Sequence, residues 1–229
     1  MPDGADHERR SPLDALDTMA VQEVEIAPGL RHLEIYTLTG LLSFWCHGPP
    51  DASSVVLACG GAMGGALGPA DGVYHHVGSE LAERGIATIR VGYRRPNDLA
   101  HCAHDLLAAA DYASRTGGDR FVTVGHSFGG AVAVQAAVAL EERAAGVVTL
   151  STQSAGCEEG EVLEGKVPVL LLHGDRDRIL PAAASEMVRF LIGGELHVLA
   201  GADHLLVEAA DEVRRHLLDW IPARFESVA

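Results

Sequence analysis

The sequence predicts an α/β fold in which helices cover both faces of a mostly parallel β-sheet. Two observations support this prediction. From residue 53 onward, short runs of β-branched and aliphatic residues alternate with longer helical segments, and the connections between them are short. Before that point, two strand-like runs flank Thr39-Gly40, which is typical of a β-hairpin.

Each element follows from its local pattern of apolar and turn-forming residues. The eight predicted strands are 31–37, 41–47, 53–59, 86–93, 121–124, 146–152, 167–174 and 195–201. The predicted helices are 74–85, 99–118, 131–140, 182–194 and 207–221. Gly85 closes the first of these helices as a C-cap. A glycine-rich stretch, 60–72, joins the third strand to this helix.

Length and composition set the bounds on domain number and partners. With 229 residues, of which 48% are hydrophobic, we expect a polar tail over 1–20 and one domain over 21–229. No run reaches the ~18 apolar residues that span a membrane, and the polar N-terminus does not resemble a signal peptide. The formal charge of −15 argues against nucleic acid and anionic membrane surfaces as partners. The four cysteines have no metal-binding spacing, which favours reduced, buried thiols and a cytoplasmic location.

The stretch from 121 to 140 contains the first functional signal. A buried strand, 121–124, is followed after six residues by an apolar helix, and Ser127 lies between Gly125 and Gly129. So sharp a turn forces the serine towards a positive φ, and glycines on both sides leave room for the bend. Gly130 would let the helix pack closely on its neighbours. The turn presents the Ser127 hydroxyl at the N-terminus of a helix.

This G-x-S-x-G turn resembles the nucleophile elbow of the α/β-hydrolase superfamily, and the resemblance extends over roughly residues 30–221. The segment His-Gly-Asp-Arg-Asp, which ends at Asp177, is similar to the H-G-x-x-D segment of the superfamily. The resemblance implies that Asp177 is the catalytic acid, with Asp175 as the alternative and a turn-stabilising role expected for it. His204 follows the last predicted strand, at the edge of the sheet where Ser127 lies. The chain thus has the serine, aspartate, histidine order of α/β-hydrolases.

The resemblance also implies an oxyanion hole made of backbone N–H groups. We expect one donor from Phe128, at the start of the elbow helix, and a second from Gly61, with Ala62 as the alternative. Relatives often carry His-Gly where this chain has Cys59-Gly60. This departure leaves the backbone donor in place, and we expect Cys59 to be a small buried hydrophobic residue.

Substrate contacts are predicted from the same loops. Only a short segment separates the strands 146–152 and 167–174, which excludes a large cap domain. In this respect the chain resembles the small lid-poor esterases and the dienelactone-hydrolase-like members of the superfamily. Arg94 and Arg95 are candidates for binding a substrate carboxylate, and the alternative is pairing with acidic surface groups. Met63 and His126 are further candidates for substrate contact.

We therefore expect a serine hydrolase that cleaves a small carboxylic ester, thioester or lactone through an acyl-enzyme, with no metal and no organic cofactor. A peptidase or perhydrolase with the same triad is an alternative, as is a non-catalytic small-molecule-binding protein on the same fold. The oligomeric state stays open. His101, His104 and the adjacent Cys102 and Asp105 resemble a metal-binding set, but without further ligands we expect a solvated helix face.

Overall fold

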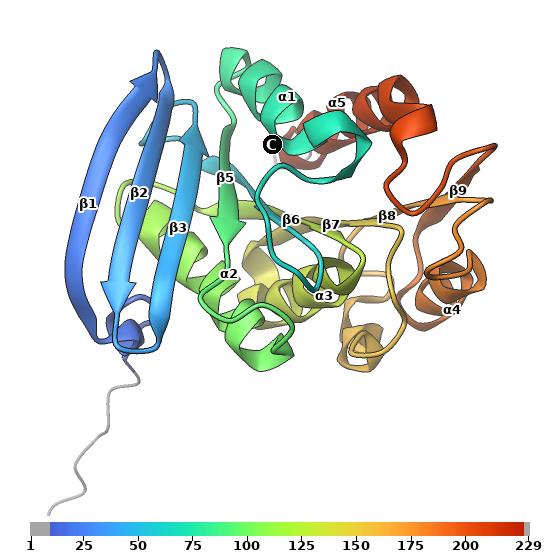
Figure 1. The fold of residues 1–229 in the computed structure, drawn as a ribbon, viewed down its shortest axis with the longest axis horizontal. Helices are drawn as coiled ribbons and strands as arrows, with labels where there is room; N and C mark the ends of the chain where they lie inside the picture. The colour runs from blue at the N-terminus through green and yellow to red at the C-terminus, as the bar shows by residue number, and fades with distance from the viewer. Residues whose placement is uncertain (1–9, 227–229) are drawn as a thin grey trace, which may run out of the picture.

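A nine-stranded β-sheet forms the centre of the computed structural model, which describes residues 10–226 (Figure 1). The strands are β1 (Thr18–Ala27), β2 (Leu30–Thr37), β3 (Gly40–His47), β4 (Ser54–Cys59), β5 (Ala87–Gly92), β6 (Arg120–His126), β7 (Ala144–Leu150), β8 (Val169–Gly174) and β9 (Glu195–Leu199). Their spatial order is β1-β2-β3-β5-β4-β6-β7-β8-β9. The pairs from β1 to β5 along this order are antiparallel, and all pairs from β5 to β9 are parallel. The predicted α/β fold with a mostly parallel sheet is confirmed.

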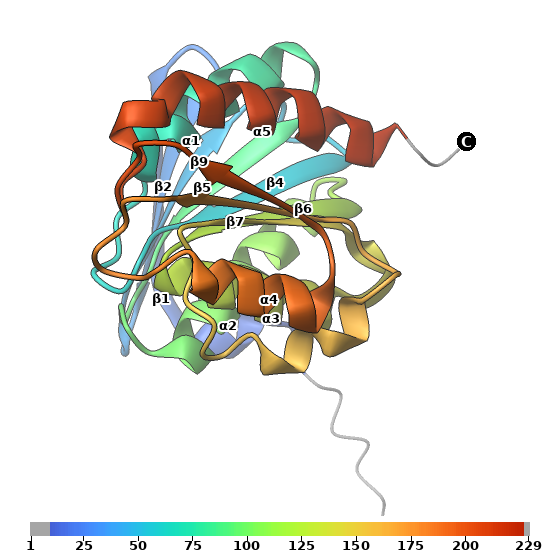
Figure 2. The ribbon, with the colours of Figure 1, turned by 90° about the vertical axis from the view of Figure 1, so that its right-hand side faces the viewer.

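Helices cover both faces of the sheet, as Figure 2 shows in side view. On one face lie α1 (Pro69–Glu83) and α5 (Ala210–Phe225), and on the other lie α2 (Leu99–Ser114), α3 (Phe128–Leu140) and α4 (Ala183–Ile192). Within residues 10–226, no helix has both the length and the apolar composition needed to span a membrane.

The central strands are buried on both faces, which explains their continuous apolar sequences. Along β4, Val55, Leu57 and Cys59 pack into the core beneath α2 and α3, while Val56 and Ala58 pack beneath α1 and α5. Helix α3 is nearly all buried because it lies under the middle of the sheet. The carboxyl ends of the parallel strands therefore meet at one well-supported edge, where the loops carry the candidate site.

Strand β1 is missing from the sequence prediction, which has eight strands and treats 1–20 as a tail. Residues 1–9 lie outside the described residues, but a short 3-10 helix at Asp14–Leu16 packs on the domain, and β1 begins within the predicted tail. Every side chain of β1 is exposed, so no alternation of apolar and polar residues marks it. Backbone pairing with β2 across the turn at Pro28-Gly29 holds the strand instead.

Two connections differ in detail from the prediction. The segment of α1 starts at Pro69, but Ala70–Gly72 have positive φ angles and are not right-handed helix, so the regular helix begins next to the predicted residue 74. The connection between β7 and β8 contains one short 3-10 helix, Glu158–Leu163, which packs on α3 and α4. The structure contains no cap domain over the described residues, as predicted.

Candidate active site

Ser127 occupies a strained turn between β6 and α3. Its φ of 57° and ψ of −121° lie in a region that side chains rarely adopt. A Cβ on Gly125 would overlap the carbonyl group of Gly129, and a Cβ on Gly129 would overlap the carbonyl oxygen of Gly60. The two glycines are therefore required by close backbone approach, as the sequence predicts. Gly130 likewise faces Thr152 at a distance that leaves no space for a side chain.

His204 lies in the loop between β9 and α5 and contacts both other members of the predicted triad. Its Nε2 is 3.0 Å from Ser127 Oγ, and its Nδ1 is 2.6 Å from Asp177 Oδ2. A carboxylate only accepts hydrogen bonds, so Nδ1 carries the proton and Nε2 is left to accept one from the serine hydroxyl. This tautomer is the one a general base needs.

Asp177 is held as a carboxylate at the end of β8. Its side chain is fully buried, and Oδ1 accepts hydrogen bonds from the backbone N–H groups of Ile179 and Leu180, at 2.8 and 2.9 Å. Burial raises the pKa of this carboxyl, but the hydrogen bonds from His204, Leu180 and Ile179 outweigh it and lower the pKa below its ordinary value. Asp177 is therefore ionised at neutral pH.

Asp175, the alternative acid, has a different role in the structure. Its Oδ1 accepts a hydrogen bond of 2.7 Å from the N–H of Gly201, which ties the loop after β8 to the loop that carries His204. The local turn hydrogen bonds that we expected from Asp175 are made by Asp177. The tie to Gly201 spans 26 residues of sequence, so no local pattern reveals it.

His173 is a second buried histidine at the site, and sequence reasoning gave it no role. Its Nε2 lies 3.0 Å from the carbonyl oxygen of Leu180 and 3.2 Å from Asp177 Oδ2. Because a carbonyl only accepts, Nε2 carries a proton, and Nδ1 accepts from the hydroxyl of Ser185 at 2.6 Å. His173 thus supports the turn that holds the acid. The sequence feature that could have predicted this role is the position of His173 at the end of an apolar strand.

The candidate oxyanion loop is supported by two tyrosines. A Cβ on Gly61 would lie 3.5 Å from Ser127 Cβ, so this residue adjoins the nucleophile. Tyr93 donates to the carbonyl oxygen of Gly60 at 3.1 Å, and Tyr74 donates to that of Cys59 at 3.0 Å. In a trans peptide the C=O and N–H groups point in opposite directions. Tyr93 therefore sets the direction of the Gly61 N–H.

The other two donor candidates, Phe128 and Ala62, also adjoin the site. Phe128 is the first residue of α3, where backbone N–H groups have no partner within the helix. Ala62 lines the same cavity as Ser127. Cys59, below this loop, is fully buried, and burial raises the pKa of its thiol to about 12. The thiol is therefore protonated at neutral pH, and all four cysteines are free and buried.

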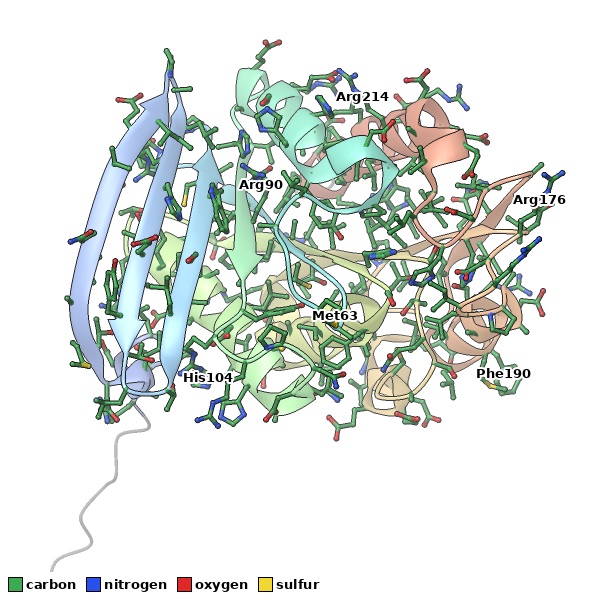
Figure 3. All side chains as sticks on the ribbon, in the orientation of Figure 1. Met63, Arg90, His104, Arg176, Phe190 and Arg214 are labelled. Carbon is green, nitrogen blue, oxygen red and sulfur yellow. The ribbon has the colours of Figure 1, made fainter. Side chains whose placement is uncertain are left out.

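A cavity of about 470 Å³ opens beside Ser127. It is lined by residues of four segments, namely 60–69, His126-Ser127, Ile179 and His204-Leu205. Met63 and His126, which we expected to contact substrate, are both part of this lining. Met63 is 93% exposed on the loop between β4 and α1, near the centre of the view in Figure 3.

Arg94 and Arg95 do not line this cavity, contrary to the carboxylate-binding expectation. Arg94 Nε lies 2.6 Å from Asp105 Oδ1, with exposed fractions of only 6% and 0% for the two side chains. Arg94 also donates to Thr39 Oγ1 at 2.8 Å. Arg95 is exposed, and its Nε is 3.4 Å from the carbonyl oxygen of Thr39. Pairing with an acidic group, the alternative expectation, describes Arg94.

The residues of α2 that resemble a metal-binding set have separate partners. His101 pairs with Asp98 at 2.8 Å, and His104 Nε2 donates to the carbonyl oxygen of Pro12 at 2.9 Å. Asp105 is fully buried against Arg94 rather than solvated as expected, since it lies on the inner side of the helix. In the part of the chain that the structure describes, no group of three or more such side chains could hold a metal ion.

One family of known proteins matches this chain. The model of the dienelactone hydrolase family matches residues 73–214, which is more than half of the chain. No curated protein sequence matches this chain.

Solved structures with the same fold include proteins described as hydrolases. Est1E from Butyrivibrio proteoclasticus superposes with a TM-score of 0.70 at 17% identity, covering 85% of this chain and 98% of that one. A dienelactone hydrolase from Anabaena variabilis has a TM-score of 0.70 at 19% identity, with 89% and 98% covered. The Xanthomonas campestris protein XC6422, described as an α/β serine hydrolase without a lid, has a TM-score of 0.65 at 19% identity, with 87% and 98% covered. At these identities the likeness shows the fold alone.

Proposed function

Because this chain belongs to the dienelactone hydrolase family and is a hydrolase acting on esters, we propose that it cleaves a small ester through an acyl-enzyme on Ser127. His204 is the general base in this proposal and Asp177 orients it. The observation that carries the proposal is the hydrogen-bonded chain from Ser127 Oγ through His204 to Asp177, with contacts of 3.0 and 2.6 Å.

The proposed reaction uses each of these groups in turn. Ser127 Oγ attacks the carbonyl carbon of the ester while His204 Nε2 takes the hydroxyl proton. The ionised Asp177 stabilises the imidazolium that forms. His204 then gives the proton to the departing alkoxide, which leaves the acyl group on the serine. A water molecule, activated by the same histidine, releases the acid.

The negative charge on the tetrahedral intermediate needs preorganised donors. We assign this role to the backbone N–H groups of Phe128 and Gly61, with Ala62 as the alternative to Gly61. The support for Gly61 is its place beside Ser127 and the tyrosine that fixes the direction of its peptide group. A cavity of about 470 Å³ without a cap domain favours short, soluble esters, thioesters or lactones. A cytoplasmic location stays a prediction from the sequence.

Labelling with a fluorophosphonate probe tests the nucleophile. We expect the native chain to be labelled at Ser127 and to hydrolyse short p-nitrophenyl esters. Ser127→Ala should abolish labelling and lower kcat by roughly 10⁴–10⁶-fold, because the elbow accepts a small residue but the nucleophile is gone. Ser53→Ala, at an exposed serine just before β4, is the matched control and should leave both unchanged.

Three outcomes would contradict the proposal. Substantial turnover by pure Ser127→Ala protein would exclude the acyl-enzyme on this residue. A folded native chain that is neither labelled nor active on esters and thioesters would favour the non-catalytic binding alternative. Turnover confined to peptides, or to peracid formation, would favour the alternative of a peptidase or a perhydrolase with the same triad.

A further inference from the structure

The cavity beside Ser127 has an uncharged wall. Apart from Ser127, His126 and His204, its lining consists of glycines and of small or apolar residues. Among the described residues that line it, none is Asp, Glu, Lys or Arg, although charged residues make up 21% of the chain. Burial lowers the pKa of His126 to about 4, so this side chain adds no charge near neutral pH. The wall offers no ionic partner to a charged substrate group.

Four exposed apolar side chains stand around the mouth of this cavity, and we call them the apolar rim. They are Met63, Leu67, Ile179 and Leu205, with exposed fractions of 93%, 64%, 69% and 52%. Large apolar side chains exposed together around a hollow are typical of a ligand-binding surface.

Three of the four segments that line the cavity carry both a proposed catalytic group and a part of the rim, and the elbow at Ser127 is the fourth. Met63 and Leu67 follow the candidate oxyanion residues, Ile179 comes two residues after Asp177, and Leu205 directly follows His204. The apolar rim is therefore held by the same backbone turns as the candidate oxyanion residues, the acid and the base. A substrate that fills the cavity beside Ser127 would therefore lie next to the rim.

Two arginines that are close to the site in sequence do not line the cavity. The guanidinium group of Arg94 is occupied by Asp105 in a buried pair. Arg176 precedes Asp177 in sequence, but Figure 3 shows it at the far edge of the molecule, well apart from Met63. It is exposed and does not line the cavity.

A second hollow of about 390 Å³ adjoins the first and shares Leu67 and Leu205 with it. Its only carboxylate or cationic side chain, within residues 10–226, is Asp71, which lies beside His75 and His76. Burial lowers the pKa of His75 below its ordinary value, which keeps this imidazole neutral. The negative charge of Asp71 opposes an anion, as does the net charge of −15 on the chain.

From these observations we infer that the site takes uncharged esters whose apolar group lies against the apolar rim, and that it discriminates against esters carrying a carboxylate. The inference rests on the proposed function of Ser127 and adds the substrate class. A carboxylate bound in this cavity would lose water and gain no cation in exchange, whereas an alkyl or aryl group would bury apolar surface against the rim.

Matched pairs of esters test the discrimination. p-Nitrophenyl hexanoate and mono-p-nitrophenyl adipate have the same leaving group and a six-carbon acyl chain, and they differ in a terminal methyl or carboxylate. Methyl 4-acetoxybenzoate and 4-acetoxybenzoate carry a neutral methyl ester or a carboxylate on the alcohol side, and release of the phenol from the acetyl ester is the reaction measured. In 0.15 M salt we expect kcat/KM to favour the neutral member of each pair by about tenfold or more. Rates with Ser127→Ala protein give the uncatalysed background.

A charge-matched pair of variants tests whether the preference for neutral esters arises at the apolar rim. Leu67→Arg puts a cation on the apolar rim, and we expect it to shift the hexanoate-to-adipate ratio about tenfold towards adipate. Phe190→Arg changes the net charge by the same amount at another exposed apolar residue, which lies on α4 and apart from Met63 in Figure 3. This control should leave the ratio nearly unchanged.

The outcomes separate this inference from the proposed function. Equal rates on both members of each pair, or faster cleavage of the anionic members, would overturn the inference while Ser127 labelling stayed intact. The same shift in Leu67→Arg and Phe190→Arg would mean that net charge, not the rim, sets the preference. Loss of labelling and of all turnover in the native chain would instead overturn the proposed function.

Discussion

His126 donates a hydrogen bond from Nε2 to the backbone carbonyl oxygen of His204, over 2.9 Å. The carbonyl can only accept, so Nε2 carries the proton. The two imidazole rings lie 4.9 Å apart between centroids. The residue next to the proposed nucleophile thus holds the backbone of the proposed base, in addition to the tie between Asp175 and Gly201.

Removal of this hydrogen bond should lower kcat more than it changes KM. We expect His126→Leu to reduce kcat about tenfold, because a small displacement of His204 weakens proton transfer from Ser127. His126→Gln keeps a side-chain donor at a similar position and should retain most of the activity. Steady-state kinetics on a short p-nitrophenyl ester measures both variants. Equal losses in the two variants would show that the hydrogen bond is not the cause.

The two aspartates after β8 should differ sharply when each is changed to asparagine. Asp177→Asn removes the anion that orients and stabilises His204, so kcat should fall by roughly 10³–10⁴-fold. Asp175→Asn affects only the hydrogen bond to Gly201 and should cost about 1 kcal/mol or less in the free energy of unfolding. Kinetics and urea unfolding of both variants check this. The reverse ranking would assign the acid to Asp175.

Arg94 should matter for stability rather than for substrate binding. Arg94→Ala leaves the buried carboxylate of Asp105 without its partner, and such a change costs about 3–5 kcal/mol in the free energy of unfolding. Arg95→Ala is the matched control at an exposed position and should stay within about 0.5 kcal/mol of the native value. Chemical denaturation separates the two. A stable Arg94→Ala protein with a raised KM for an anionic ester would restore the carboxylate-binding role.

Stability should fall as the pH is lowered below 6.5, in part because of two buried histidines. Burial lowers the pKa of His47 and of His126 from 6.5 to about 4. Between these values the unfolded chain binds more protons than the folded one, so folding weakens as pH falls, by at most about 1.4 kcal/mol per pH unit for each group. Above pH 6.5 both groups are neutral in both states and the effect vanishes.

Substitution of His47 should make this pH dependence less steep. His47→Leu removes one of the two titrating groups, whereas His76→Leu removes an exposed histidine and serves as the control. Urea unfolding at pH 7.5, 6.0 and 5.0 gives the slope for each protein. An unchanged slope in His47→Leu would contradict a neutral buried imidazole at this position.

The local sequence determined most of the architecture and the identity of the candidate reacting groups. The strands β4 to β8 could be predicted from their apolar runs because both faces of these strands are buried. The elbow at Ser127 could be predicted because only glycine tolerates the contacts at Gly125 and Gly129. Strand β1 could not be predicted, since its side chains are all exposed and only its pairing with β2 defines it.

Only the tertiary structure decided which side chains meet. From the sequence, Arg94 was a candidate for substrate binding, but the fold places it against Asp105. The sequence also predicted local turn hydrogen bonds for Asp175, and in the structure Asp177 makes them. The supports from His173 and Tyr93, and the uncharged cavity wall, likewise depend on contacts between loops far apart in the chain. Backbone conformation follows from neighbouring residues, whereas the partner of a polar side chain depends on where separate strands end, and no local pattern contains that information.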